Sequence, residues 1–206
     1  MEKVLEHNQV LISGEIASKF EFSHKAYGEN FYIAYLEVIR KSNAIDKIPV
    51  MFSERLVNVN EDLRGLTANV YGRYSSYNMH DGKRTRLILT VFATEVEIWE
   101  NGLQSHENNV IYLEGTICKE PVYRETPSGR YITDLIIAVN RDYGKSDYIP
   151  CICWGRTAKF ASTLQVGTIC SVKGRIQSRN YTKVIDGQAI EKVAYEVSLS
   201  SLEVWK

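Results

Sequence analysis

The chain lacks a net charge, a long apolar run and a secretory leader pattern. It holds 25 Lys plus Arg and 25 Asp plus Glu in 206 residues, so its total charge does not indicate a polyanionic partner. Residues 1–104 hold 12 basic and 14 acidic side chains, and residues 105–206 hold 13 and 11, which weakly favours the second half as the anion-binding half. No apolar segment approaches the roughly 18 residues of a membrane span. We therefore expect a soluble, cytoplasmic protein with no membrane partner.

The chain is also poor in residues that would hold a metal or perform catalysis. Its four cysteines lie in apolar, strand-like runs, and the C-x-C spacing fits neither a zinc ribbon nor a redox motif, so we expect buried, reduced thiols at Cys118, Cys151, Cys153 and Cys170. The four histidines are scattered through polar stretches, and no phosphate-binding glycine loop or nucleophile elbow is present. We expect no metal, no cofactor and no enzymatic activity.

The sequence contains an internal repeat. The segment "NQVLISGEI" from Asn8 matches "NNVIYLEGTI" from Asn108, which places Gly14 against Gly115 (115 − 14 = 101). The offset holds through Ile48-Pro49 against Ile149-Pro150, and becomes 102 at Gly72-Arg73 against Gly174-Arg175. Both copies end alike, in "VEIWE" and "LEVWK". We predict two domains, residues 1–103 and 107–206, joined by a short polar link.

Each copy has the pattern of a small barrel. In the second copy, strands are predicted at Val110–Cys118, Tyr131–Val139, Asp147–Trp154, Thr168–Asn180 and Ala189–Val204. One helix is predicted at Thr157–Leu164 and, in the first copy, another at Glu54–Leu63. "DG" turns follow at Asp81 and Asp186. Five strands with a helix between the third and fourth is the order of an oligonucleotide-binding barrel. The predicted fold is all-β, with two tandem five-stranded barrels.

Two stretches of the second copy, Arg141–Trp154 and Arg175–Tyr181, combine aromatic and basic side chains. Alternation predicts one strand face with Tyr148, Pro150, Ile152 and Trp154, and an opposite face with Ile149, Cys151 and Cys153. The same counting places Arg175, Gln177, Arg179 and Tyr181 on a common face. Exposed rings beside guanidinium groups suit stacking of unpaired bases and pairing with phosphates. The structural alternatives are that Trp154 caps the barrel and that Tyr181 lies on a solvated hairpin.

Residues 108–206 resemble the bacterial single-stranded DNA-binding protein family of the replication type. The resemblance lies in "NNVIYLEGTICKEPVYRETPSGRYITDLIIAVNR", "DYIPCICWGRTAKFASTLQVGT" and "VKGRIQSRNY" with the following "DG". It implies base-stacking roles for Tyr143, Tyr148, Trp154 and Tyr181, and phosphate-contacting roles for Arg141, Lys173, Arg175 and Arg179. The family often has tryptophan or phenylalanine at the stacking positions, so three tyrosines imply weaker stacking. Two barrels in one chain resemble the fused forms of the family, which implies a homodimer with four barrels.

The first copy departs from the family at the stacking positions. Ser42, Lys47 and Ser53 stand where the second copy has Tyr143, Tyr148 and Trp154, and only Tyr74, Tyr77 and Met79 lie near the fourth position. Each stacking platform contributes about 1–3 kcal/mol. We therefore expect the first barrel to be a structural or pairing partner and the second barrel to hold the nucleic acid.

The expected function is non-catalytic, largely sequence-independent binding of single-stranded DNA in replication, recombination or repair. RNA is a second candidate ligand, because stacking does not read the sugar. The family's acidic C-terminal tip is not found after Lys206, so we expect no recruitment of proteins through such a tip. The alternative is an accessory protein-interaction subunit that kept the barrel and lost most of its nucleic-acid binding.

Overall fold

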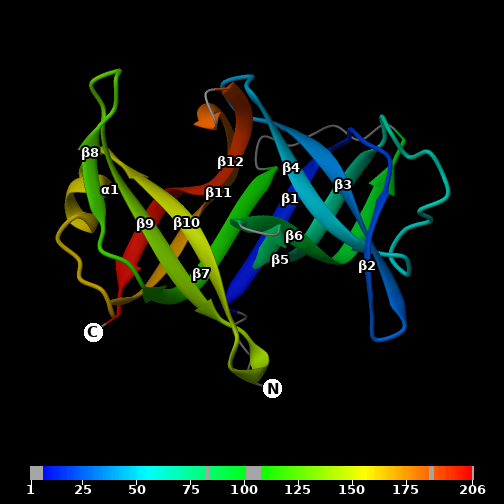
Figure 1. The fold of residues 1–206 in the computed structure, drawn as a ribbon, viewed down its shortest axis with the longest axis horizontal. Helices are drawn as coiled ribbons and strands as arrows, with labels where there is room; N and C mark the ends of the chain where they lie inside the picture. Colours follow the sequence, from blue (N-terminus) through cyan, green and yellow to red (C-terminus); the bar gives the residue numbers. More distant parts are fainter. Residues whose placement is uncertain (1–6, 82–83, 101–107, 186–187, 206) are drawn as a thin grey trace.

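The computed structural model describes residues 7–81, 84–100, 108–185 and 188–205, which form twelve β-strands, one 3-10 turn and one α-helix (Figure 1). The strands of the first half are β1 (Asn8–Ile16), β2 (Glu21–Ala26), β3 (Glu29–Ile39), β4 (Ile45–Ser53), β5 (Thr67–Asp81) and β6 (Arg84–Trp99). The second half comprises β7 (Asn109–Ile117), β8 (Val122–Glu125), β9 (Tyr131–Asn140), the 3-10 turn η1 (Asp142–Gly144), β10 (Ser146–Trp154), α1 (Gly155–Ala161), β11 (Ile169–Ile185) and β12 (Gln188–Val204).

Strand pairing closes each half into a ring. In the first half β1 pairs with β3, and the ring continues through β4, β6 and β5 back to β1. The second half repeats this circuit as β7, β9, β10, β12 and β11. Two five-stranded barrels therefore stand in tandem, which confirms the predicted fold class. The predicted link between the domains, at residues 103–107, falls outside the described residues, so the domain limits stay a prediction.

A repeated glycine allows each ring to close. Gly115 lies where β7 changes its pairing partner from β11 to β9, and a Cβ atom there would overlap the carbonyl oxygen of Ala138. Gly14 occupies the same place in β1, against the carbonyl oxygen of Glu37. The match between the two glycines in the internal repeat thus reflects a close approach of two backbones.

The predicted elements need three corrections. An additional short strand, β8 in the second half and β2 in the first, pairs on the outside of each ring, so the described residues of each half form six strands rather than five. The predicted helix at Thr157–Leu164 is observed as Gly155–Ala161. The helix predicted at Glu54–Leu63 was wrong.

Residues 54–63 form a series of turns instead of a helix. The Asn58 carboxamide accepts the Asn60 amide at 3.3 Å and donates to Glu61 at 2.6 Å, so local side-chain hydrogen bonds compete with helical ones. Leu56, Val57 and Leu63 of this segment pack against the core without forming a helix. None of the helices in the described part of the chain is long and apolar enough to cross a membrane.

The cysteines are free thiols, and three of them are buried as expected. Burial raises the pKa of Cys151 well above its ordinary value, that of Cys153 to about 12 and that of Cys170 to about 11, so these groups are neutral and unreactive at pH 7. Cys118 was predicted to be buried but is exposed, because it follows the end of β7.

The two barrels are joined edge to edge. Residues 8–12 of β1 pair antiparallel with residues 109–113 of β7, so one twelve-stranded sheet runs through both halves (Figure 1). Two further hydrogen bonds extend the ladder, from the Ser13 amide to the Asn108 carbonyl and from the Glu114 amide to the His7 carbonyl, each 2.7 Å. These bonds are related by the repeat offset, so the junction has approximate two-fold symmetry.

Two buried aspartates hold the long hairpin of each half against the other half. Asp46, in β4, accepts the Ser178 backbone amide of β11 at 2.6 Å. Asp147, at the matching position in β10, accepts the Ser76 backbone amide of β5 at 2.6 Å. Both carboxylates are fully buried, so their hydrogen bonds fix where each hairpin crosses the neighbouring barrel.

The two aspartates differ in their arginine partners. Arg40 binds Asp46 through Nε and Nη2, both at 2.6 Å, and Arg175 lies 3.7 Å from the same carboxylate. On the other side, Arg141 Nε lies 3.4 Å from Asp147, and within the described ranges neither this nitrogen nor Asp147 Oδ2 has a hydrogen-bond partner. Burial is the largest influence on Asp147 and raises the pKa of its carboxyl, although the Ser76 amide and Arg141 oppose the shift.

We predict that Asp46→Asn destabilises the protein more than Asp147→Asn at pH 7. The first substitution leaves Arg40 and Arg175 without their counter-charge, and removing one partner of a buried ion pair costs about 3–5 kcal/mol. The second keeps an acceptor for the Ser76 amide and loses only a 3.4 Å charge contact with Arg141, so it should cost about 1 kcal/mol or less. Urea denaturation of both variants measures the difference; equal losses would contradict the assigned asymmetry.

The raised pKa of Asp147 predicts a pH dependence. A carboxyl that holds its proton more tightly in the folded chain contributes stability below its unfolded pKa of about 3.8 and loses it as the pH rises through the folded value. The free energy of unfolding of the wild type should therefore rise relative to that of Asp147→Asn as the pH falls from 7 towards 4. Urea titrations at a series of pH values test this, and a constant difference would show the prediction to be wrong.

Candidate nucleic-acid interface

Strand β10 presents the two aromatic side chains that its alternation predicts. Tyr148 and Trp154 are exposed, at 48% and 37%, while Ile149, Cys151 and Cys153 face the core. Ile152, on the predicted outer face, is the exception and is buried. The Trp154 indole Nε1 donates to the Ser198 hydroxyl of β12 at 3.2 Å, which fixes the ring without removing it from solvent. Trp154 is therefore partly open to solvent at the surface of the barrel.

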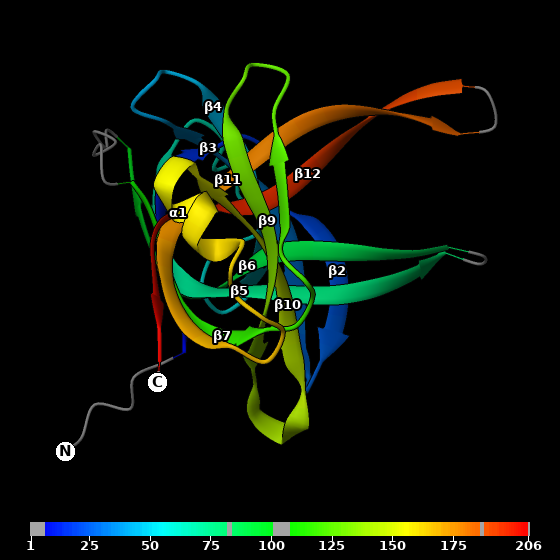
Figure 2. The same cartoon turned by 90° about the vertical axis from the view of Figure 1, so that its left-hand side faces the viewer.

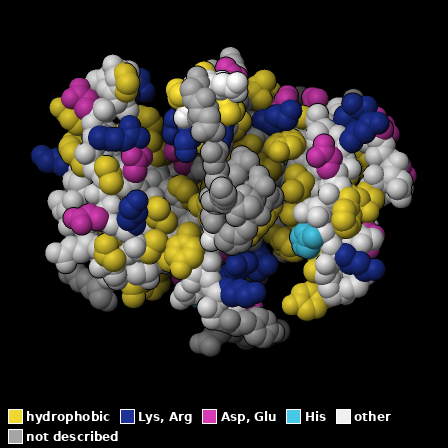
Figure 3. Space-filling model, in the orientation of Figure 1, with side chains coloured by type: hydrophobic (Ala, Val, Ile, Leu, Met, Phe, Trp, Pro, Cys, Tyr) yellow, Lys and Arg dark blue, Asp and Glu magenta, His cyan; other side chains and the backbone are white. Residues whose placement is uncertain are grey.

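Trp154 lines a cleft between the β8–β9 hairpin and the start of α1, which lie side by side in Figures 1 and 2. This aromatic cleft has a volume of about 670 Å³ and is lined by Tyr123, Arg130, Tyr131, Trp154, Gly155, Arg156 and Lys159. Three basic side chains and no carboxylate are among these residues. In the space-filling view, Lys and Arg are interspersed with hydrophobic side chains over this half of the molecule (Figure 3).

The rings of Tyr123 and Tyr131 form a stacked pair in this cleft. Their centroids are 5.5 Å apart and their planes differ by 7°. Tyr123 lies opposite Thr133 and Tyr131 opposite Glu125, so the rings meet diagonally across the β8–β9 hairpin. Because both side chains are about half exposed, the pair offers a flat apolar surface on which a nucleobase can stack.

The predicted pair Arg179 and Tyr181 lies on the arm formed by β11 and β12, which extends away from the barrel (Figure 2). The Arg179 guanidinium lies over the Tyr181 ring, 5.8 Å from its centroid, and 4.0 Å from Glu196. Gln177 was predicted on the same exposed face but is buried and donates to Glu196 at 2.7 Å. Only the outer part of this stretch is therefore open to a ligand.

The other predicted basic residues lie near the junction. Arg141 and Arg175 face the buried aspartates Asp147 and Asp46, so part of their charge is already neutralised within the protein. Lys173 is exposed beside the junction, on a different surface from the aromatic cleft. The backbone of Tyr143 lies in η1, and its side chain is outside the description. Of the eight predicted residues, one lies in the cleft (Trp154), two on the arm (Arg179 and Tyr181) and three near the junction (Arg141, Lys173 and Arg175). Tyr148 lies elsewhere on β10, and the side chain of Tyr143 is not described.

The first half exposes few aromatic rings at the positions that correspond to the predicted stacking residues. Tyr74 is fully buried, which raises its pKa well above the ordinary value, so it is not a stacking platform. Tyr77 is partly exposed, at 37%, and Met79 has no described side chain. Lys47, at the position of Tyr148, lies over the Tyr35 ring at 5.5 Å, and Ser53, at the position of Trp154, is buried.

Residues 108–204, which include the cleft and the arm, match the Single-strand binding protein family. The similarity to that family covers the C-terminal half of this chain. "Single-stranded DNA-binding protein A" of Bacillus subtilis is 36% identical over 80 residues, 35% of this chain and 46% of the relative. "Single-stranded DNA-binding protein 1" of Staphylococcus aureus is 38% identical over 80 residues, with 35% of this chain and 48% of the relative covered. The chain thus spans about half the length of these curated relatives.

The fold of the whole chain is also found in a solved structure. The wild-type single-stranded DNA binding protein from Thermus aquaticus superposes with a TM-score of 0.71 over 97% of this chain and 93% of that one, at 19% identity. The similarity extends through both halves, so the tandem arrangement of barrels is shared. At this identity it supports the fold alone.

The sequence patterns missed most of the aromatic cleft. Tyr123, Arg130 and Tyr131 flank the "TPSG" turn, and Arg156 and Lys159 follow Trp154 on α1. Strand β8 is exposed along its whole length and so lacks the alternation that predicts a strand. The only indication of a hairpin with paired rings in the sequence was a tyrosine on each side of this turn. No group of His, Cys, Asp or Glu within the described ranges could hold a metal ion.

We predict that Ser198 restrains the Trp154 ring. In a chain carrying Trp99→Phe and Trp205→Phe, Trp154 is the sole tryptophan. There, Ser198→Ala removes the partner of Nε1 and should increase quenching of Trp154 by acrylamide and lower the free energy of unfolding by about 0.5–1.5 kcal/mol. Ser200→Ala, on the same strand, is the control. Unchanged quenching in Ser198→Ala would refute the restraint.

Proposed function

We propose that this protein binds single-stranded DNA without catalysis, by stacking bases on the rings of the second barrel and pairing phosphates with basic side chains. The observation that supports this most directly is the aromatic cleft. Three exposed rings and three cations converge there, in the half that matches the Single-strand binding protein family. The relatives in that family are named for single-stranded DNA binding.

The chemistry of the cleft fits unpaired nucleobases. Stacking needs an uncovered ring face. Tyr123, Tyr131 and Trp154 each keep a third or more of their surface exposed, and the stacked tyrosines cover one face of each other, which leaves the outer faces for a base. Every base has a π-face, so such platforms carry little sequence preference. Arg130, Arg156 and Lys159 provide positive charge at the same place, which attracts the phosphates between the bases.

The platforms continue along the second half. Tyr148 lies six residues before Trp154 on the same face of β10, about 20 Å away at the rise of a strand, and Tyr181 lies on the β11–β12 arm. A strand of several nucleotides is needed to reach from the cleft to the arm. We propose a path over the aromatic cleft and Tyr148 to Arg179 and Tyr181.

We predict that Tyr131→Ala weakens binding of an oligothymidylate by the full chain about 5- to 150-fold, the equivalent of 1–3 kcal/mol for one stacked base. Quenching of Trp154 in the single-tryptophan chain reports the titration. Tyr27→Asn, a fully exposed tyrosine of the first half at φ 50° where asparagine is tolerated, is the control and should bind like the wild type.

Two results of this titration count against the proposal. If the wild type shows neither quenching nor an affinity that falls with salt, the protein does not bind single-stranded DNA. If it binds but Tyr131→Ala and Tyr148→Ala keep full affinity, the ligand lies on another surface. Adding an oligouridylate as competitor determines whether RNA shares the site.

A scaffold function is the second candidate. The zero net charge and the serine and lysine at three stacking positions of the first half favour a subunit that joins other proteins. Absence of Trp154 quenching would favour this candidate.

We also propose a homodimer with four barrels, on the resemblance to fused members of the family. A mass in solution of twice 23.6 kDa would support it, and 23.6 kDa would oppose it.

A further inference from the structure

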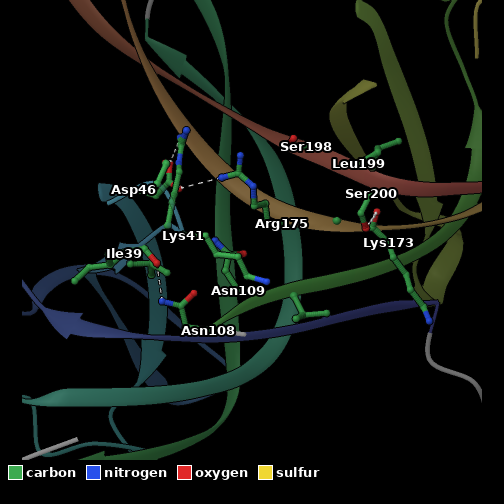
Figure 4. A pocket seen from close by; sticks show the side chains of 15 residues that line it. Ile39, Lys41, Asp46, Asn108, Asn109, Lys173, Arg175, Ser198, Leu199 and Ser200 are labelled. Carbon is green, nitrogen blue, oxygen red and sulfur yellow. Dashed lines mark hydrogen bonds and ion pairs between the residues drawn. The ribbon is translucent and has the colours of Figure 1, made fainter. Parts of the chain in front are cut away.

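A second hollow lies between the two barrels. This junction pocket has a volume of about 850 Å³ and is bounded by the end of β3, the following turn, β4, β7, β11 and β12. Figure 4 shows Asp46 and Lys41 of the first half on one side and Lys173 and Arg175 of the second half on the other. Both halves must be present to form it.

The charge of the junction pocket is strongly positive. Its lining contains Arg40, Lys41, Lys173 and Arg175, against the single carboxylate of Asp46. Both oxygens of that carboxylate accept hydrogen bonds from Arg40. Lys41 and Lys173 therefore provide positive charge in excess of what the fold neutralises, and Arg175 shares the Asp46 carboxylate only at 3.7 Å.

Arg175 has an unsatisfied group at this place. Its Nη1 is shielded from solvent and, among the residues that the structure describes, has no hydrogen-bond partner, because Asp46 Oδ2 is 3.7 Å away. Burial and the nearby Arg40 charge lower the Arg175 pKa, and Asp46 opposes that shift. An anion in the pocket would offset the Arg40 charge.

Comparison of the two halves distinguishes charges that both sides of the junction share from charges that only one side has. Arg40, Asp46 and Arg175 correspond to Arg141, Asp147 and Arg73, so that part of the network serves the junction on both sides. Lys41 and Lys173 instead correspond to Asp142 and Tyr71. The approximate two-fold symmetry of the junction does not require these two lysines, and the opposite side carries an acid and a ring in their place.

The lining favours a phosphodiester backbone over a base or a single anion. It contains no aromatic side chain, and Asn109, Ser198 and Ser200 supply polar groups. Lys173 and Arg175 point in different directions from β11, so the cations are spread along the pocket rather than directed at one point (Figure 4). Ser198 also accepts the hydrogen bond from Trp154, so the pocket adjoins the stacking surface.

We propose that the junction pocket binds the sugar–phosphate backbone of single-stranded nucleic acid as it passes from the second barrel to the first. This inference rests on the proposed function and extends it. The first barrel then contributes phosphate contacts, through Lys41, although it lacks most of the stacking platforms. The binding unit is the tandem chain.

The test compares a long and a short oligothymidylate on the full chain, with about 35 and about 8 nucleotides. Lys41→Gln combined with Lys173→Gln should reduce the slope of log affinity against log salt for the long oligonucleotide by about 1.4, at about 0.7 for each lost phosphate contact. The short oligonucleotide, held in the aromatic cleft, should bind as to the wild type. Lys19→Gln combined with Lys25→Gln removes the same charge from exposed sites of the first half and should leave both slopes unchanged.

The outcomes separate this inference from the proposed function. If the slope for the long oligonucleotide is unchanged in Lys41→Gln/Lys173→Gln while Tyr131→Ala still weakens binding, the junction pocket is not on the path and the proposed function stands. If inorganic phosphate raises the melting temperature of the wild type but not of the double lysine variant, with no change in slope, the pocket binds a small anion and the inference is overturned. Loss of the short-oligonucleotide affinity in the double lysine variant also overturns it.

Discussion

The antiparallel pairing of β1 with β7 is the interaction on which the rest of the structure depends. Each strand already closes its own barrel, and the pairing of residues 8–12 with residues 109–113 joins the two rings into one sheet. It also brings each long hairpin against the neighbouring barrel, where a buried aspartate accepts a backbone amide from it. Without this pairing, the backbone N–H and C=O groups at these edges of β1 and β7 would face solvent. The junction between the two barrels pairs them with each other.

Much of the fold could be predicted because its causes are local or repeated. Strand alternation located β10 and the apolar face opposite Tyr148, and the constant offset of the repeat revealed two equivalent barrels. The helix predicted at Glu54–Leu63 failed because hydrogen bonds from Asn58 favour turns there. The roles of Asp46 and Asp147 were not predictable, since Ser178 lies 132 residues from Asp46 and no sequence pattern relates the two.

The sequence predicted the part of the candidate site that lies on a single strand. It did not predict the part that several elements form together. The exposure of Trp154 was predicted from the alternation along β10. The stacked pair of Tyr123 and Tyr131 depends on the β8–β9 hairpin, and the sequence of the fully exposed β8 has no alternation from which a strand could be predicted. Arginine patterns were misleading for a related reason. A guanidinium on a strand face can pair with a phosphate or with a carboxylate, and Arg141 and Arg175 have carboxylates in the protein that only the tandem packing places there.

A duplicated chain can give the two sides of such a junction different charges, which two identical chains related by a two-fold axis cannot do. The paired arginines and aspartates are kept on both sides, because both hairpins need an anchor. The neighbouring positions differ between the two sides. One side has Lys41 and Lys173, and the other side has Asp142 and Tyr71 at the corresponding positions, because neither hairpin anchor requires a lysine there. A polyanion that crosses the junction therefore meets one attractive side and one side without the surplus lysines. The two halves thus differ in the charge of this surface and share the contacts that hold the barrels together.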